Sequence, residues 1–425
     1  MDVSTSWRAR SGQMNGTLRV EQSCAKALTG LMPGQIRFCR YHQVKRCFVP
    51  LDSYPDISAR PIVATEAQGR TMLSSLRPLG RRIERTMRNS VRAATGRIFQ
   101  QVENSDSLPA LGSDSRNEVL LLAGENWSQY NFGVIARLRR ERGIKVAALC
   151  QDFIPVACPQ FFGDGEFVAK FSAYAEFLIR ETDLVLAISN ATRSDILDYA
   201  SSHGGMRGSI EIVTLGADLP SSQHAKQPDG LSNAQAERFV LSVSTIQSRK
   251  NFDLLYHVWR RLTEQNTPGL PTLVIVGQPG FGSRDLLWQI AHDPVTRDKI
   301  VILNRASDDE LIWLYQNCLW TLYPSFYEGW GLPVSESLAF GKYCLASNAS
   351  SIPEAGAGFA GLIDPLDFAS WCNAVVELMN SPDQLARLEA SIRAGYQPIT
   401  WTKSAGEIAN KLSKLSAKNP AMHNE

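Results

Sequence analysis

Short apolar runs and longer amphipathic segments alternate along most of this chain of 425 residues. A continuous apolar run is typical of a strand that is buried on both faces of a sheet. An amphipathic segment with apolar residues at every third or fourth position is typical of a helix packed on such a sheet. Strands and helices in this order form a parallel sheet covered by helices, so the sequence predicts an α/β fold.

This alternation occurs twice, once on each side of a polar stretch. In the first half we expect strands at 118–123, 145–150, 184–188 and 210–215, helices at 131–143 and 167–182, and a helix start at 189–195. In the second half we expect strands at 238–244, 272–276, 299–303, 319–323, 344–346 and 362–363, with helices between them and after them. The two halves share an architecture but no short sequence repeat.

A chain of this length is too long for one ordinary domain. The stretch from Pro220 to Glu237 is polar and rich in turn residues, so it is the expected domain boundary. We therefore expect two doubly wound domains that face a cleft. The predicted parts are a first domain at 1–220, a linker at 221–237, a second domain at 238–398, and a helix with a tail at 399–425.

The beginning of the chain fits this pattern less completely. Asp2-Val-Ser has the character of the end of a first strand, so we expect that strand to be truncated. A helical pattern opens at Gly16 and continues through Leu31, and short strands are plausible at 36–38 and 47–49. A glycine before a helix either turns the chain or admits a ligand, and the residues alone favour the turn.

The segment 72–99 has an apolar stripe at helical spacing, with arginines on its other faces and Glu84 as its single acidic residue. A basic amphipathic helix of this kind, over about 76–99, can lie on an anionic membrane surface. It can equally be a surface helix of the first domain with a solvated arginine face. The sequence favours neither interpretation over the other.

Composition limits the classes of function. The chain is 44% apolar with a net charge of +2, so it can build cores, and no nucleic-acid partner is indicated. Its eight cysteines show no paired spacing, which favours a reducing compartment. No apolar stretch is long enough to span a bilayer, so we expect a cytoplasmic protein that is soluble or attached to a membrane surface. Scattered histidines and the lack of an Asp-x-Asp motif predict no metal site.

The stretch 323–341 carries the most chemistry. It has the pattern of a strand end, a glycine-bearing loop and a short helix, with Pro333 in the first turn and Gly341 as a left-handed stop. Two carboxylates, Glu328 and Glu336, stand eight positions apart. The glycines and the helix N-terminus suit an anion such as a diphosphate, while the carboxylates suit sugar hydroxyls. In the plainer interpretation, the carboxylates only cap the helix.

The residues around these carboxylates decide between the two interpretations. Glu-Gly-Trp-Gly-Leu-Pro at 328–333, the second glutamate, and Ser-Ile-Pro-Glu at 351–354 resemble the donor-sugar loop of family 4 glycosyltransferases, which belong to glycosyl transferase group 1. The resemblance implies a retaining enzyme of the GT-B fold. In that fold two Rossmann-like domains face a cleft, and a C-terminal helix crosses back onto the first domain.

The resemblance implies roles for the second domain's residues. Glu328 would hold hydroxyls of the donor sugar, and Glu336 would accept the two ribose hydroxyls of the nucleotide. Backbone N–H groups of the loop would meet sugar or phosphate oxygens; these belong to Trp330, Gly331 and Leu332.

A second motif, at 244–251, resembles a diphosphate-binding loop. Lys250 matches the family's diphosphate-binding lysine, whereas Thr245 stands where the family has an arginine. Arg249 supplies a neighbouring cation whose planar fork suits phosphate oxygens. The motif is closest to a Gly-Thr-Ile-Glu-Pro-Arg-Lys-Asn subgroup that resembles mannosyltransferases.

On the first domain the family often has His-Asp where this chain has Gln151-Asp152. The resemblance implies that Gln151 keeps a polar contact with the donor sugar, without a role in proton transfer. Asp152 either orients the acceptor or caps the following turn, and the cap is the favoured interpretation. Gly16 matches a glycine that faces the acceptor in many members of the family.

The implied reaction is glycosyl transfer from a nucleotide sugar, with no cofactor or metal. GDP-mannose is the favoured donor and a UDP-sugar stays open. The acceptor would be a glycan or a lipid-linked glycan in cell-surface polysaccharide or lipopolysaccharide synthesis, at the inner face of the membrane. Two alternatives remain: a synthase with a soluble sugar acceptor, and a catalytically silent glycan-binding or scaffold subunit.

Overall fold

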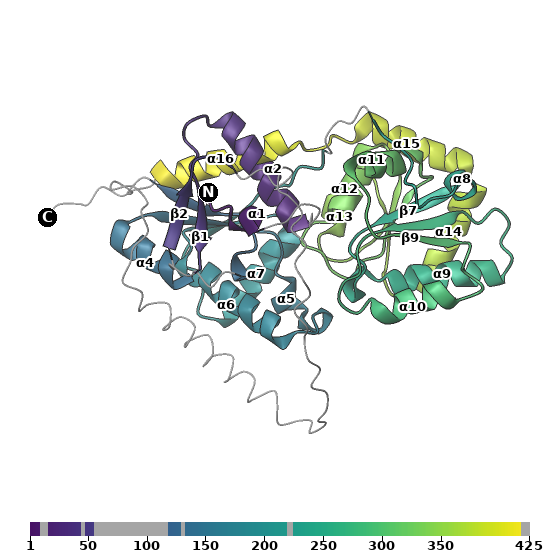
Figure 1. Ribbon diagram of the computed structural model, residues 1–425, viewed down its shortest axis with the longest axis horizontal. Coiled ribbons are helices and arrows are strands. Elements are labelled where there is room, and N and C mark those ends of the chain that lie inside the picture. The colour runs from purple at the N-terminus through teal and green to yellow at the C-terminus, as the bar shows by residue number, and fades with distance from the viewer. Residues whose placement is uncertain (9–15, 44–46, 55–117, 129–131, 219–223, 418–425) are drawn as a thin grey trace, which may run out of the picture.

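The computed structural model describes residues 1–8, 16–43, 47–54, 118–128, 132–218 and 224–417. Within these ranges the chain forms two α/β lobes side by side, and each lobe is built on a parallel sheet (Figure 1). The predicted segment 72–99 lies outside the described residues. The described ranges contain no helix with the length and apolar character that crossing a membrane requires.

The first lobe contains a four-stranded sheet in the order β3-β4-β5-β6, with every pair parallel. Its strands alternate along the chain with α4 (Phe132–Arg142), α6 (Gly165–Glu181) and α7 (Asn190–Ser202). The strands are β3 (Val119–Leu122), β4 (Lys145–Cys150), β5 (Leu184–Ala187) and β6 (Ser209–Ile212). The predicted alternation in this half is confirmed, with strand and helix ends shifted by at most three residues.

Both faces of β4 and β5 are buried and β3 is nearly so, which is why these strands read as continuous apolar runs, whereas the edge strand β6 is partly exposed. Leu120 and Val146 point into the core shared with α4, α6 and α7. Leu121 and Ala147 point into the opposite core, which is shared with α2 (Gly16–Leu31) and α16 (Trp401–Ala417).

The beginning of the chain joins the first lobe. Asp2 forms parallel bridges to Cys39 and Leu122, so the predicted strand end does lie beside β3. The helix α1 (Ser4–Arg8) follows it, and β1 (Phe38–His42) pairs antiparallel with β2 (Cys47–Leu51). The strand predicted at 36–38 was therefore wrong in its bounds, because only Phe38 belongs to β1.

The second lobe contains a six-stranded parallel sheet in the order β12-β11-β10-β7-β8-β9. The first strand of this lobe, β7, lies next to β10 in the middle of the sheet, and the strand order runs outward in opposite directions from this pair. The strands are β7 (Phe239–Val243), β8 (Thr272–Val276), β9 (Ile300–Leu303), β10 (Thr321–Tyr323), β11 (Cys344–Ser347) and β12 (Gly361–Ile363). Ligands of open parallel sheets bind where the strand order reverses, beyond the carboxyl ends of the strands.

Helices cover both faces of this second sheet. Trp259 of α9 and Trp371 of α14 are fully buried in the core on one side. Tyr315 of α11 is fully buried on the other side. The helices are α8 (Asn233–Ala236), α9 (Phe252–Glu264), α10 (Arg284–His292), α11 (Asp308–Asn317), α12 (Leu332–Ala339), α13 (Ile352–Gly356), α14 (Phe368–Asn380) and α15 (Pro382–Gly395).

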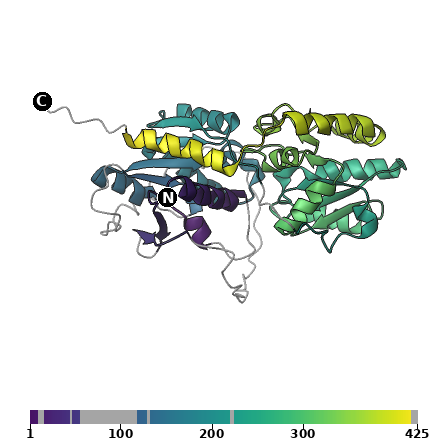
Figure 2. The ribbon, with the colours of Figure 1, turned by 90° about the horizontal axis from the view of Figure 1, so that it is seen from above.

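The last described helix, α16, returns to the first lobe, as predicted, and lies along α2 (Figures 1 and 2). Its first residue is fastened there because the Trp401 N–H donates to Asp218 Oδ1 over 2.6 Å. The Ala217 N–H donates to the Ile399 carbonyl over 2.9 Å, so the residues just before α16 are bound to the first lobe as well. The predicted crossover is therefore present.

All eight cysteines lie in described ranges as free thiols, and five of them are buried. Burial raises the pKa of Cys24 and of Cys318 to about 12, so these thiols stay protonated at neutral pH.

Candidate donor site at the switch point

Two loops meet where β7 and β10 lie side by side. The loop after β7 contains the short 3-10 helix Ser248–Lys250 and ends at Asn251, whose φ of 56° is left-handed. The Phe326 N–H donates to the Arg249 carbonyl over 2.9 Å, which joins this loop to the loop after β10. The Asn251 side-chain amide donates to the Pro324 carbonyl over 3.2 Å. These bonds hold the two predicted motifs together.

Four side chains from these loops form one buried group, which we call the Glu328 cluster: Arg249, Lys250, Tyr323 and Glu328. Lys250 Nζ lies 2.6 Å from Glu328 Oε1, and Arg249 Nη1 lies 2.7 Å from Glu328 Oε2. The Tyr323 hydroxyl donates to Glu328 Oε1 over 2.9 Å and accepts from Lys250 Nζ over 3.0 Å. The structure therefore brings together three residues predicted separately, and adds a tyrosine.

The cluster shifts the pKa values of its members. Burial by itself would raise the pKa of Glu328, but the charges and hydrogen bonds of Arg249 and Lys250 outweigh it and lower that pKa to about 2. Burial lowers the pKa of Lys250 to about 8, although Glu328 acts in the opposite direction. Glu328 is therefore ionised at neutral pH, and Lys250 keeps its proton only because the carboxylate stays beside it.

Serines of the neighbouring segment fix the loop that carries Glu328. The Glu328 N–H donates to Ser350 Oγ over 2.8 Å. Ser351 Oγ donates to the carbonyls of Glu328 and Trp330, each over 2.9 Å. Sequence reasoning singled out the segment 351–354 but assigned no role to these hydroxyls. Their role is structural, because they determine where the Glu328 backbone lies.

The helix α12 begins directly after this loop. Gly331 has a φ of 110°, which a residue with a side chain rarely adopts, and Pro333 stands in the first turn. Gly341, with a φ of 70°, follows the end of the helix, as predicted. The Trp330 ring N–H donates to Ser335 Oγ over 3.1 Å, so its side chain folds back onto α12. The helix α12 thus begins four residues after Glu328, and the first N–H groups of a helix lack the acceptors that its later turns have.

Glu336 has partners for both carboxylate oxygens. Oε2 accepts from the Tyr315 hydroxyl over 2.9 Å, and Oε1 pairs with Arg19 Nη1 of the first lobe over 2.7 Å. Sequence reasoning missed Arg19 because its partner comes from a different domain, more than three hundred residues along the chain.

The first-lobe residues predicted for the site lie across from this loop. A side chain at Gly329 would approach the Gln151 carbonyl to 2.0 Å, so the two backbones are in direct contact. Gln151 Nε2 donates to the Ala123 carbonyl over 2.8 Å and is thus held by its own lobe. Asp152 Oδ1 accepts from the Ile154 N–H over 3.2 Å, which agrees with the predicted cap. Burial raises the pKa of Asp152, and nearby Arg249 opposes the rise.

Other contacts join the two lobes around the site. Glu354 accepts hydrogen bonds from the backbone N–H groups of Asn190 and Ala191, over 2.8 and 3.0 Å, at the start of α7. The Tyr327 hydroxyl donates to Asp195 Oδ1 over 2.6 Å. The two lobes therefore contact each other directly around the switch point.

Two predicted residues lie apart from the Glu328 cluster. Thr245 is exposed, and a Cβ at Gly280 would approach its methyl group to 2.9 Å, so it packs toward the loop after β8. Gly16 is the first residue of α2, and a Cβ added there would meet no atom within 4 Å. The backbone at Gly16 thus borders open space.

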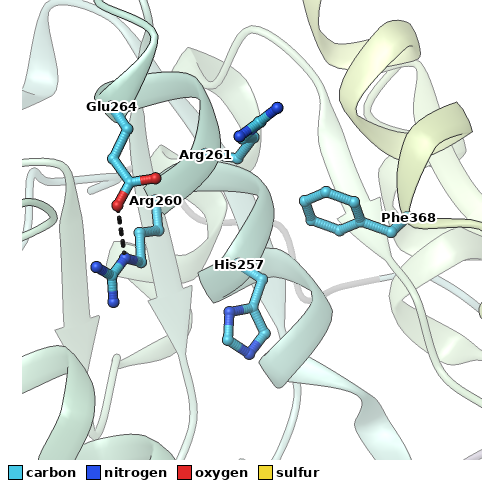
Figure 3. A pocket seen from close by; sticks show the side chains of 5 residues that line it. All are labelled: His257, Arg260, Arg261, Glu264 and Phe368. Carbon is cyan, nitrogen blue, oxygen red and sulfur yellow. Dashed lines mark hydrogen bonds and ion pairs between the residues drawn. The ribbon is translucent and has the colours of Figure 1, made fainter.

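A surface hollow elsewhere on the second lobe lies between α9 and α14 (Figure 3). It contains none of the predicted site residues, and its Arg260 pairs with Glu264 over 3.0 Å. It is lined by His257, Arg260, Arg261, Glu264 and Phe368. The described residues hold no group of three or more metal-binding side chains arranged around a common point.

Two parallel sheets, a site at the switch point of the second sheet and a final helix that returns to the first define the GT-B fold, the class of glycosyltransferases with two Rossmann-like domains. Solved structures with this fold are similar to the chain at low identity. Anabaena Alr3699/HepE in complex with UDP and glucose has a TM-score of 0.55 and 17% identity over 76% of this chain and 82% of that one. An α,α-trehalose-phosphate synthase (UDP-forming) from Burkholderia xenovorans has a TM-score of 0.56 and 12% identity over 77% of this chain and 78% of that one.

The sequence comparisons give the particular family. Residues 224–394 match the family of glycosyl transferases group 1, and this part of the chain belongs to it. The serotype-specific mannosyltransferase WbdA of Escherichia coli is 24% identical over 266 residues, which are 61% of this chain and 32% of that protein. The O-antigen chain mannosyltransferase B of Escherichia coli is 30% identical over 234 residues, 55% of this chain and 61% of that protein. The chain thus spans only part of the length of these relatives.

Proposed function

We propose that this protein is a retaining glycosyltransferase that transfers a sugar from a nucleotide-sugar donor to a glycan or lipid-linked acceptor. The observation that carries the proposal is the Glu328 cluster. It places two cations and a carboxylate, largely buried, at the point of the second sheet where ligands of such folds bind. A purely structural ion pair does not require this position, and burying charges costs free energy that pairing only partly offsets.

The donor would exchange partners within this cluster. Hydroxyls of the sugar would donate to Glu328, and oxygens of the diphosphate would accept from Lys250 and Arg249. Each buried charge then keeps a partner, so the exchange leaves no charge uncompensated. The backbone N–H groups of Gly331 and Leu332 would add donors for a phosphate oxygen at the start of α12.

The reaction would be accelerated by stabilisation of the leaving group. As the bond from the anomeric carbon to the phosphate oxygen breaks, positive charge grows on the sugar ring and negative charge on the diphosphate. Lys250, Arg249 and the N-terminus of α12 would stabilise the negative charge, and Glu328 would face the positive ring. An acceptor hydroxyl would attack on the face from which the diphosphate leaves, which gives retention, and its proton would pass to that diphosphate.

The favoured donor is GDP-mannose, because the relatives with matching sequence are named mannosyltransferases. A solved neighbour is described in complex with UDP-glucose, so a UDP-sugar is the alternative. By the same analogy, the acceptor would be a growing cell-surface polysaccharide or an O-antigen chain on a lipid carrier. This would place the protein in the cytoplasm, at the inner face of the membrane.

A panel of nucleotide sugars tests the donor half of the proposal. Isothermal titration with GDP-mannose, UDP-glucose and UDP-N-acetylglucosamine should show binding of one donor at micromolar to millimolar affinity. Release of the matching nucleoside diphosphate should then be accelerated by lipid extracts or oligosaccharides that contain the acceptor. A protein that binds none of the donors would be a silent scaffold subunit instead, whereas transfer to a free monosaccharide phosphate would identify a synthase.

A further inference from the structure

Arg19 connects the first lobe to the donor site. It stands three residues after the start of α2, which Figure 1 shows directed at the second lobe. Its guanidinium reaches Glu336, with 2.7 Å between Nη1 and Oε1. The Glu336 side chain is 3% exposed and the Arg19 side chain 23%, so the pair is largely shielded from solvent. A pair in this setting is screened less than a surface salt bridge.

The pairing conflicts with the role proposed for Glu336. One of its oxygens already accepts from the Tyr315 hydroxyl, and the other is occupied by Arg19. A ribose that donates one hydroxyl to each oxygen of this carboxylate competes with Arg19 for Oε1. Binding of the ribose in this way would displace the guanidinium of Arg19 from Oε1.

The charges at the site indicate that the displaced guanidinium would move to the diphosphate of the donor. Arg249 and Lys250 are balanced by Glu328 and Glu336, so the second lobe brings no net positive charge to a diphosphate with two negative charges. Thr245, where the resembling family has an arginine, adds none. Among the described residues that contact this site, Arg19 supplies the remaining cation.

In a bound nucleotide, the diphosphate would lie close to the displaced Arg19 guanidinium. Its diphosphate is attached through one carbon to the ribose ring, so a group displaced from the ribose carboxylate lies next to the phosphates. The start of α2 adds to the attraction, because the helix dipole gives its N-terminus a partial positive charge. The backbone there, at Gly16, borders open space.

We propose that Arg19 is a ligand of the donor diphosphate that occupies Glu336 while the site is empty and moves to the phosphates when the ribose takes its place. This inference rests on the proposed function. It means that the first lobe contributes a charged group to donor binding. It also means that Arg19 favours binding only of ligands that carry phosphates.

The inference is tested by comparing a nucleoside with its diphosphate. Calorimetric titration of the full chain would use guanosine and GDP, or uridine and UDP, according to the base that the wild type binds. In Arg19→Gln, the diphosphate should bind roughly 10- to 100-fold more weakly because a charge-assisted contact is lost. The nucleoside should bind several-fold more tightly, because Glu336 no longer has to be vacated.

Two further variants complete the test. Arg19→Lys keeps the charge and should retain most of the affinity for the diphosphate. It keeps the test interpretable if the glutamine variant fails to fold. Arg180→Gln removes another first-lobe arginine that pairs with a glutamate, Glu176, over 2.6 Å on the surface of α6. This control should bind both ligands like the wild type.

The outcomes separate the inference from the function beneath it. A wild type that binds neither diphosphate overturns the proposed function, and the role of Arg19 falls with it. A wild type that binds a diphosphate, with an Arg19→Gln variant that changes both ligands equally or neither, overturns the role of Arg19 alone. Opposite changes for nucleoside and diphosphate support the exchange.

Discussion

Lys250 Nζ and Glu328 Oε1 lie 2.6 Å apart, although one residue follows β7 and the other follows β10. The contact exists because these two strands, remote in sequence, are neighbours at the centre of the second sheet. In the free protein, the group expected to bind phosphate therefore neutralises the group expected to bind sugar. A donor that carries both a phosphate and a hydroxyl-rich ring can replace both partners at once.

The buried position of Lys250 predicts how nucleotide affinity depends on pH. Its pKa is lowered to about 8 in the folded protein, against 10.5 for an ordinary lysine. The phosphates of a nucleoside diphosphate are already ionised at pH 8, so they need the protonated lysine. Affinity should be constant below pH 8 and should fall by up to about tenfold per pH unit above it.

Calorimetric titrations of GDP or UDP between pH 6.5 and 9.5 measure this effect. Lys250→Arg is the matched control, because arginine stays charged throughout this range, and its affinity should not follow the decline. The same pKa gives a sign for stability: between pH 8 and 10.5 the unfolded chain binds more protons at this residue, so its contribution to the free energy of unfolding should rise with pH. A wild-type affinity that stays flat to pH 9.5 would contradict the assignment of Lys250.

Tyr323 is predicted to position Glu328 rather than to react. Its hydroxyl bridges Glu328 and Lys250, and its side chain is buried. Tyr323→Phe removes about 1.5–3 kcal/mol of charge-assisted hydrogen bonding, so kcat should fall about tenfold or more while the KM for the donor changes less. Tyr256→Phe is the control, since it removes a hydroxyl that donates to Asp293 over 3.0 Å in the same lobe. Equal activity in the two variants would show that the bridge has no role.

The two lobes approach so closely at Gly329 that a larger residue there should keep them apart. A methyl group there would lie 2.0 Å from the Gln151 carbonyl and 2.7 Å from Asp152 Cβ, which the backbone cannot accommodate without moving a lobe. Gly329→Ala should lower kcat/KM by roughly 10² or more, because displacements near 1 Å have such effects, with little change in melting temperature. Gly165→Ala adds a methyl group that meets no atom within 4 Å and should behave as wild type. A fully active Gly329→Ala would mean that this contact is not part of the working state.

The crossover helix is predicted to stabilise the first lobe. Trp401 is 8% exposed in the core that α16 shares with α2 and the first sheet. Trp401→Ala should lower the free energy of unfolding by about 3–5 kcal/mol, measured by urea denaturation. Trp288, which is 63% exposed on α10, is the control, and its alanine variant should change stability by less than about 0.5 kcal/mol. Equal losses in the two variants would contradict the docking of α16.

Local pattern was enough to predict most of the fold. Strands such as Thr272–Val276 are buried on both faces and therefore read as continuous apolar runs. The loop that carries Glu328 was predictable too, because glycine and proline at 329–333 have few backbone alternatives. The strand at Phe38–His42 was misplaced because Arg40 and His42 interrupt its apolar pattern while it pairs at the edge of a small hairpin.

Contacts between the lobes could not be predicted from local pattern. Arg19 looks like a surface arginine on an amphipathic helix, and only the packing of two domains brings it to Glu336. The pairing of Lys250 with Glu328 has the same origin, because the sequence indicates two ligands for one donor but not their contact in its absence. The roles of Thr245 and Gln151 as donor contacts stay predictions, with Thr245 exposed and Gln151 bonded to its own lobe.

The central claim is that the Glu328 cluster binds and activates a nucleotide sugar. It is tested most directly by the rate of nucleoside diphosphate release from the preferred donor, with and without acceptor, in the wild type and in Glu328→Gln. Glu264→Gln, which removes a carboxylate from an exposed pair on α9, serves as the control. We predict a loss of roughly 10²–10³ in rate for Glu328→Gln and none for the control. Release that is equal in all three proteins, or absent from the wild type with every donor, would contradict the account.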